Sequence, residues 1–138
     1  MMRPCHVAYH SMESDIMQTK INWFEIPSTD FSRAVKFYET IFDSKLKLEQ
    51  FGEFPMGIFG GPDGDSVGCV IHGEHFAPNP NGPVLYMDAS SGLDAVLSRI
   101  EAAGGQIVME KMELPQDLGY IAHFIDTEGN RLALHAMH

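Results

Sequence analysis

The sequence has few basic residues, few cysteines and no long apolar run, and each shortage excludes a class of protein. Lysine and arginine number 9 against 19 acidic residues, a net charge of −10, which disfavours nucleic acids and anionic membranes as partners because phosphate binding needs clustered cations. No run approaches the roughly 20 apolar residues of a membrane helix. Cys5 and Cys69 are far apart and are expected to be free thiols. Since the first 18 residues lack a signal-peptide pattern, we expect a cytoplasmic protein.

Two amphipathic helices are predicted by apolar residues at spacing 0, 3, 4 and 7. The chain has 138 residues, 44% of them hydrophobic, which suffices for one domain with a real core. Thr29 or Asp30 is a suitable N-cap for the first helix, Ser91 to Asp94 resembles a capping box before the second, and Gly104 with Gly105 ends it. The apolar residues at this spacing are Phe31, Ala34, Val35 and Tyr38 in the first helix and Leu93, Val96, Leu97 and Ile100 in the second.

The strand patterns make the chain a β-α-β-β-β unit repeated at an interval of about 55–60 residues. Strands are predicted at 21–26, 45–51, 56–59 and 67–71, and again at 84–88, 106–113, 120–126 and 131–136. A loop at 73–82, rich in proline and glycine, separates module 1 (about 20–72) from module 2 (about 83–138), and residues 1–19 form an N-terminal extension. The predicted fold is α+β, one domain over 20–138. Pairing the modules would enclose a cleft between two curved sheets, a natural ligand site.

The last hairpin carries the most informative motif, D-T-E-G-N-R-L-A-L-H, which begins at Asp126. Glycine takes positive φ without penalty and asparagine tolerates it, so Glu128 to Asn130 are predicted to form the turn. Alternation along the last strand then places Leu132 and Leu134 on one face, with Arg131, Ala133 and His135 on the other.

This hairpin resembles the last one of vicinal oxygen chelate proteins: glyoxalases, bleomycin-resistance proteins and extradiol dioxygenases. In that superfamily the motif has the form D-P-[DE]-G-N-x-[IL]-E-L, and its glutamate is a metal ligand. The strand at 21–26 with Asp30 and A-V-K-F-Y also resembles the family's opening, and L-D-A with A-A-G-G its second helix. The resemblance is greatest to small uncharacterised glyoxalase-related members, and it implies paired βαβββ modules around a cleft.

Family enzymes hold a metal with four side chains, one from the first and one from the last strand of each module. The corresponding positions here are about Trp23, Gly68, Val84 and Ala133. None of these side chains can bind a metal ion, so we expect no metal cofactor. A shifted set of Glu25, His123 and His135, binding Zn, Ni, Mn or Fe, is the alternative.

Alternation along the family's strands predicts which side chains face the cleft. Glu25 and His135 are the candidate catalytic residues, because a carboxylate in such a cleft can act as a general base. These residues, and the ligand-binding candidates given next, also have plainer explanations. In these explanations Glu25 lies at a sheet edge in water, His135 or His123 is exposed to solvent, and Trp23 or Tyr86 is an ordinary packing residue. The candidate ligand-binding residues are Trp23, Val70, Val84, Tyr86, His123 and Ala133.

Two functions follow from the resemblance. The first is a metal-independent protein that binds a small organic ligand in an apolar cleft, as the bleomycin-resistance branch implies, and the acidic charge would suit a cationic ligand. The second is a metal-dependent lyase, isomerase or dioxygenase of the glyoxalase type, in which the metal stabilises an enediolate. The absent ligands favour the first. The resemblance also implies a homodimer.

Overall fold

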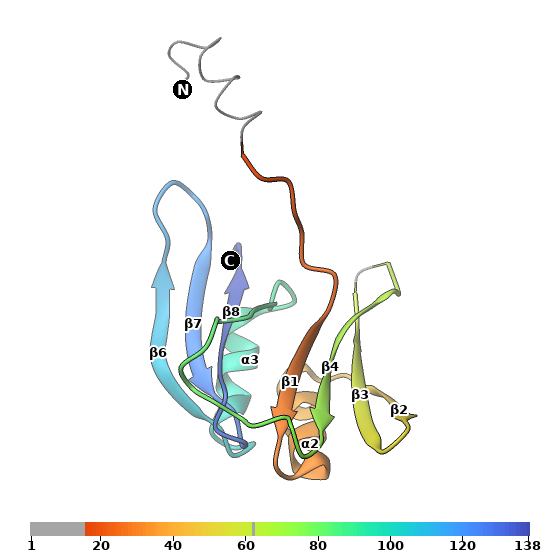
Figure 1. Ribbon diagram of the computed structural model, residues 1–138. Helices are drawn as coiled ribbons and strands as arrows, with labels where there is room; N and C mark the ends of the chain where they lie inside the picture. The colour runs from red at the N-terminus through yellow and green to blue at the C-terminus, as the bar shows by residue number, and fades with distance from the viewer. Residues whose placement is uncertain (1–15, 62) are drawn as a thin grey trace.

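The computed structural model describes residues 16–61 and 63–138 and confirms the repeat (Figure 1). Most of the expected extension, residues 1–15, lies outside the described part. Module 1 consists of β1 (Phe24–Ser28), α2 (Phe31–Phe42), β2 (Lys47–Phe51), β3 (Phe54–Gly60) and β4 (Ser66–His72). Module 2 consists of β5 (Tyr86–Asp88), α3 (Leu93–Ile100), β6 (Gln106–Glu113), β7 (Tyr120–Ile125) and β8 (Arg131–Ala136).

Each module forms one four-stranded sheet, and the two sheets have the same strand order. The orders are β1-β4-β3-β2 and β5-β8-β7-β6. In each sheet the first and last strands pair in parallel and the other neighbours pair antiparallel. Figure 1 shows α2 and α3 behind the sheets, so both sheets turn a helix-free face to the same side. The α+β prediction is therefore confirmed.

Neither helix within the described residues has the length and apolar character needed to cross a membrane.

The helices form largely for the local reasons that the sequence indicates. The Asp30 side chain accepts a hydrogen bond from the Arg33 N–H at the start of α2, and Asp43 ends the helix in the left-handed region at φ 50°, a conformation that aspartate tolerates. The predicted capping box of α3 is wrong. Gly92 is the N-cap and no side chain caps the helix. A capping box needs the serine at the N-cap, and Ser91 lies one residue before it.

The first strands of both modules are shorter than predicted. β1 begins at Phe24, opposite Gly68 of β4, and β5 begins at Tyr86, opposite Ala133 of β8. Trp23 and Val84 therefore precede their strands, since a strand extends only as far as its partner offers backbone hydrogen bonds.

One hydrophobic core joins the modules between the sheets and the helices. Phe37 of α2 and Phe124 of β7 pack with ring centroids 6.0 Å apart, and both side chains are almost completely buried. Leu132 and Leu134 also lie in this core, as the alternation in β8 predicts. Buried aromatic pairs of this kind contribute large apolar areas and restrict the geometry of packing.

The turn between β7 and β8 fixes module 2 to module 1 through Asp126. This residue is 4% exposed. Its Oδ2 accepts hydrogen bonds from the Tyr38 hydroxyl of α2 at 2.6 Å and from Asn130 Nδ2 at 3.0 Å, and its Oδ1 accepts from the N–H groups of Glu128 and Asn130. Asn130 Nδ2 also donates to the Pro27 carbonyl at 2.8 Å. The geometry of the turn thus depends on a buried carboxylate with four donors.

Glu128 makes a second connection from the same turn to the N-terminus of α2. Its buried carboxylate accepts from the N–H groups of Thr29 and Asp30 at 2.9 and 2.8 Å and from Arg33 Nε at 2.8 Å. Burial alone would raise the pKa of Glu128, but these bonds and the Thr127 and Thr29 hydroxyls outweigh it and lower the pKa to about 2. An anion is favoured at this end of a helix.

Candidate functional site

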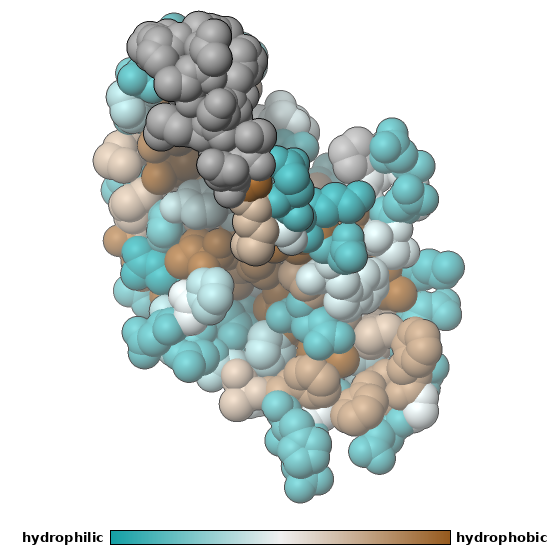
Figure 2. Space-filling model, turned by 45° about the horizontal axis from the view of Figure 1, so that its top comes forward, coloured by the Kyte–Doolittle hydropathy of each residue, from teal (hydrophilic) through white to brown (hydrophobic). Residues whose placement is uncertain are grey.

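The helix-free faces of the two sheets carry five of the side chains that the sequence places around the cleft, namely Glu25, Tyr86, His123, Ala133 and His135. In Figure 2 hydrophobic surface extends across the middle of the visible face and is bordered by hydrophilic side chains. Each sheet holds its own pocket on this side, and a third pocket lies between the modules. Such concave, mainly apolar sites are where small ligands bind in proteins.

The pocket of module 1 has a volume of about 430 Å³, and half of its lining residues are aromatic. The Phe54 and Phe76 rings meet edge to face with centroids 5.7 Å apart, so the loop after β4 closes one side of it. Glu25 is the one acidic residue of the lining, and it is exposed to solvent. The lining consists of Trp23, Glu25, Phe51, Phe54, Met56, Ile58, Ile71 and Phe76.

The prediction that Val70 faces the cleft is wrong. Val70 pairs with Ile26 in the parallel register of β1 and β4, and both side chains are buried in the core beneath the helices. Glu25 pairs with Cys69, so Cys69 takes the position facing the cleft. The pairing of β3 with β4 is continuous from Gly68 to Ile71, so β4 alternates regularly and the predicted alternation was one residue out of step.

Gly68, the expected metal-ligand position in β4, also faces the core. The Phe24 ring covers it so closely that a Cβ at position 68 would lie 2.5 Å from that ring. This close approach gives a physical reason for glycine here, and it means that no side chain could reach the cleft from this position.

Cys69 is completely buried beneath the module 1 pocket. Its Sγ lies 3.7 Å from Met56 Sδ. Burial, and then the negative charge of Glu25, raise the pKa of the Cys69 thiol to about 12. The thiolate is the form that binds metals and attacks electrophiles, so at neutral pH this cysteine behaves as a small apolar side chain.

In module 2, three of the predicted residues lie together on the helix-free face. The Tyr86 hydroxyl is 3.0 Å from His123 Nε2, and the two rings meet edge to face. Ala133, which is fully buried, pairs with both Tyr86 and His123 in the sheet. Arg131 Nε donates to His123 Nδ1 at 3.1 Å. Burial, and then the charge of Arg131, lower the pKa of His123, which therefore stays neutral at neutral pH.

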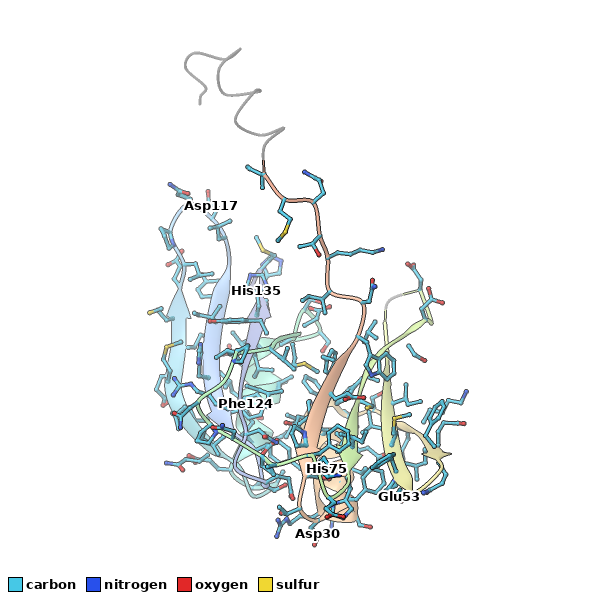
Figure 3. The ribbon with its side chains drawn as sticks, in the orientation of Figure 1. Asp30, Glu53, His75, Asp117, Phe124 and His135 are labelled. Atoms are coloured by element: carbon cyan, nitrogen blue, oxygen red, sulfur yellow. The ribbon has the colours of Figure 1, made fainter. Side chains whose placement is uncertain are left out.

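His135 lines the second pocket, about 410 Å³, with Tyr86, Asp88, Leu114 and Ile121. Its Nε2 donates to the Leu118 carbonyl at 2.7 Å. Figure 3 shows His135 near the end of β8, close to the β6–β7 loop that carries Asp117. His135 thus holds this loop beside the pocket.

The third pocket, about 530 Å³, lies between the modules, and Tyr86 is the one residue of its lining that the sequence analysis named as a candidate. Residues of α2, β3 and β4 form one side and residues of β5, including Tyr86 and Asp88, form the other.

Phe51, Phe54 and Phe76 were not predicted from the sequence as pocket residues. The sequence analysis did place Arg131 on the same face as Ala133 and His135, and that alternation was the signal that could have marked it as a site residue.

The residues at the family's metal positions do not fit a metal ion. Trp23, Val84 and Ala133 have no ligand atoms in their side chains. In β4 the ligand position falls on Gly68, which has no side chain, or on Cys69, whose thiol is protonated. Across residues 16–61 and 63–138, no group of three or more histidine, cysteine, aspartate or glutamate side chains is placed to hold one. The shifted set of Glu25, His123 and His135 is therefore not assembled within one chain.

Solved structures confirm the fold. A glyoxalase/bleomycin resistance protein from Albidiferax ferrireducens T118 superposes with a TM-score of 0.60 at 18% identity, covering 82% of this chain and 94% of that one. The fosfomycin resistance protein FosX from Listeria monocytogenes superposes with a TM-score of 0.61 at 17% identity, covering 87% and 94%.

Sequence comparison extends the likeness from fold to family. A glyoxylase-like domain-containing protein from Didymella fabae is 30% identical over 125 residues, which cover 86% of this chain and 94% of the relative. The family model described as the Glyoxalase/Bleomycin resistance protein/Dioxygenase superfamily matches residues 20–134. The chain therefore belongs to the glyoxalase/bleomycin resistance protein/dioxygenase superfamily.

Proposed function

We propose that this protein binds a small organic ligand on its helix-free side through its own side chains, without a metal ion. The observation that carries the proposal is the module 1 pocket, which combines four aromatic side chains with one carboxylate, Glu25. Pockets of this size with apolar walls and few polar groups bury most of a small ligand. Side chains without ligand atoms at three of the family's metal positions support the metal-independent form of binding.

The pocket's chemistry favours a ligand with an apolar body and a positively charged group. The rings of Trp23, Phe51 and Phe54 offer faces to which a cation is attracted, worth about 0.5–2 kcal/mol per contact. Glu25 adds a negative charge at the same place, and the net charge of −10 acts in the same direction. We therefore assign Glu25 to ligand recognition and prefer this role to that of a general base.

The alternative, a metal-dependent lyase, isomerase or dioxygenase, gains no support from the geometry of one chain. Glu25 lines the module 1 pocket, whereas His135 lines the module 2 pocket. A metal site built from both would need a second copy to bring them together.

We also propose that the protein acts in the cytoplasm as a homodimer. Several large apolar side chains near the two pockets are exposed, among them Phe51 at 66% and Leu118 at 54%. Exposed apolar groups of this kind are typical of surfaces that a partner covers.

Phenyltrimethylammonium and its uncharged isostere tert-butylbenzene test the proposed site. In buffer containing EDTA, we expect the cation to bind the native protein and the Glu25→Gln variant to bind it about threefold to tenfold more weakly, because the carboxylate charge is lost. Binding of tert-butylbenzene should be unchanged by this substitution. Thermal shift and NMR titration measure both affinities.

Glu49→Gln is the matched control, since Glu49 is exposed on β2 and lines none of the three pockets. An equal loss of affinity in both variants would show only a general charge effect. If the cation binds only after a divalent metal is added, the metal-independent proposal fails.

A further inference from the structure

The hydrogen bonds among Arg131, His123 and Tyr86 determine the direction in which each proton points. An arginine side chain carries its protons at every pH of interest and can only donate. Arg131 Nε donates to His123 Nδ1 at 3.1 Å, so Nδ1 is the acceptor and carries no proton. A neutral imidazole then has its proton on Nε2.

The proton on His123 Nε2 fixes the role of Tyr86 in turn. Nε2 lies 3.0 Å from the Tyr86 hydroxyl oxygen, so the histidine donates and the tyrosine oxygen accepts. The tyrosine's own O–H proton must therefore point elsewhere. Within residues 16–61 and 63–138 it has no acceptor among the hydrogen bonds, and the side chain is 50% exposed. A hydroxyl whose oxygen already accepts a hydrogen bond is a stronger donor.

The position of Tyr86 directs this donor to a ligand. Tyr86 lines both the module 2 pocket and the pocket between the modules. We propose that Tyr86 is a specificity-determining residue, and that it donates a hydrogen bond to the oxygen of a neutral carbonyl compound bound in the module 2 pocket. This inference rests on the proposed binding function and adds the class of ligand group that module 2 selects.

The other groups of the pocket decide between a neutral carbonyl and a carboxylate. Asp88 lies on the same lining, and its negative charge repels an anion. His135 uses its Nε2 proton on the Leu118 carbonyl and offers a ligand no second donor while it is neutral. Leu114 and Ile121 supply apolar contacts. The best fit is a ketone, ester or amide on an apolar body.

The proton positions can be tested without a ligand. In ¹⁵N-labelled protein at pH 7, long-range ¹H–¹⁵N spectra should show His123 as the neutral form with the proton on Nε2. The Arg131→Met variant should lose this preference, because nothing then donates to Nδ1. A proton on Nδ1 in the native protein overturns the inference.

The selectivity is tested with acetophenone and with ethylbenzene, which has the same shape without the oxygen. We expect acetophenone to bind about fivefold to tenfold more tightly, since one hydrogen bond contributes roughly 1 kcal/mol. In Tyr86→Phe the ratio should fall to about one while the affinity for ethylbenzene is unchanged. Tyr120→Phe, whose ring lies beneath Lys111, is the control that should keep the native ratio.

Each outcome decides the inference separately from the proposed function. Equal affinities for the two compounds in the native protein, or an unchanged ratio in Tyr86→Phe, overturn the role of Tyr86. Acetophenone that leaves the Tyr86 and His123 signals unmoved up to about 20 mM, well above a millimolar Kd, also overturns it. The cation experiment with Glu25→Gln decides the proposed function whichever of these results is found.

Discussion

Replacing Asp126 with alanine should lower the free energy of unfolding by about 3–5 kcal/mol, because the substitution leaves several buried donors without an acceptor. The Tyr38 hydroxyl loses a bond of 2.6 Å in the middle of the core. Burial, and then the charge of Asp126, raise the pKa of Tyr38 well above its usual value, so this hydroxyl stays protonated and needs its acceptor. The N–H groups of Glu128 and Asn130 lose theirs as well.

Urea denaturation followed by tryptophan fluorescence measures the effect of Asp126→Ala. Tyr38→Phe removes one of the donors and should cost less, about 1–2 kcal/mol. The exposed Asp63, changed to alanine, should cost under about 0.5 kcal/mol. A loss in Asp126→Ala no larger than in Asp63→Ala would contradict the view that the β7–β8 turn holds the modules together.

Acid should destabilise the native protein through Glu128 over a defined range of pH. The pKa of Glu128 is about 2 in the folded protein, against an ordinary value of 4.5. A carboxylate with a lowered folded pKa stabilises the fold above its ordinary pKa, and this stabilisation is lost as the pH falls toward the folded pKa. The contribution should therefore be complete above about pH 5 and decline between about pH 5 and 2.

Glu128→Gln is expected to lose about 2–3 kcal/mol at pH 7, since it keeps the shape but removes the charge that accepts from Arg33 and the start of α2. The difference between native protein and variant should shrink as the pH is lowered from 5 to 2. Urea midpoints at several pH values measure this difference. A constant difference across the range would mean that the charge of Glu128 does not stabilise the fold.

Local patterns in the sequence predicted most of the fold. The 0, 3, 4, 7 spacing located both helices, and alternation placed Leu132 and Leu134 in the core and Arg131 on the opposite face. Val70 was misplaced by one residue of register, because it pairs with the buried Ile26 rather than with Glu25. Which face of a strand turns to the core depends on how it pairs with its neighbours, and a single strand's alternation does not contain this.

The candidate site was less predictable than the fold. Four of the predicted residues divide between the pockets of the two sheets, with Trp23 and Glu25 in module 1 and Tyr86 and His135 in module 2. The others line none of the three pockets: Val70, Val84, His123 and Ala133. Phe76 comes from the loop after β4 and reaches the pocket only because that loop packs against Phe54. The path of a loop is a tertiary property that periodicity cannot report. The contact between Arg131 and His123 likewise depends on the register of two strands.

Metal content tests the account's central claim most directly. Untagged protein would be incubated with Zn, Ni, Mn or Fe, desalted and measured by mass spectrometry. Because the described residues gather no metal-binding group, the account predicts less than about a tenth of an equivalent per chain in every case. Near-stoichiometric metal that is lost in Glu25→Gln or His135→Ala would contradict it and show that a site forms from both pockets.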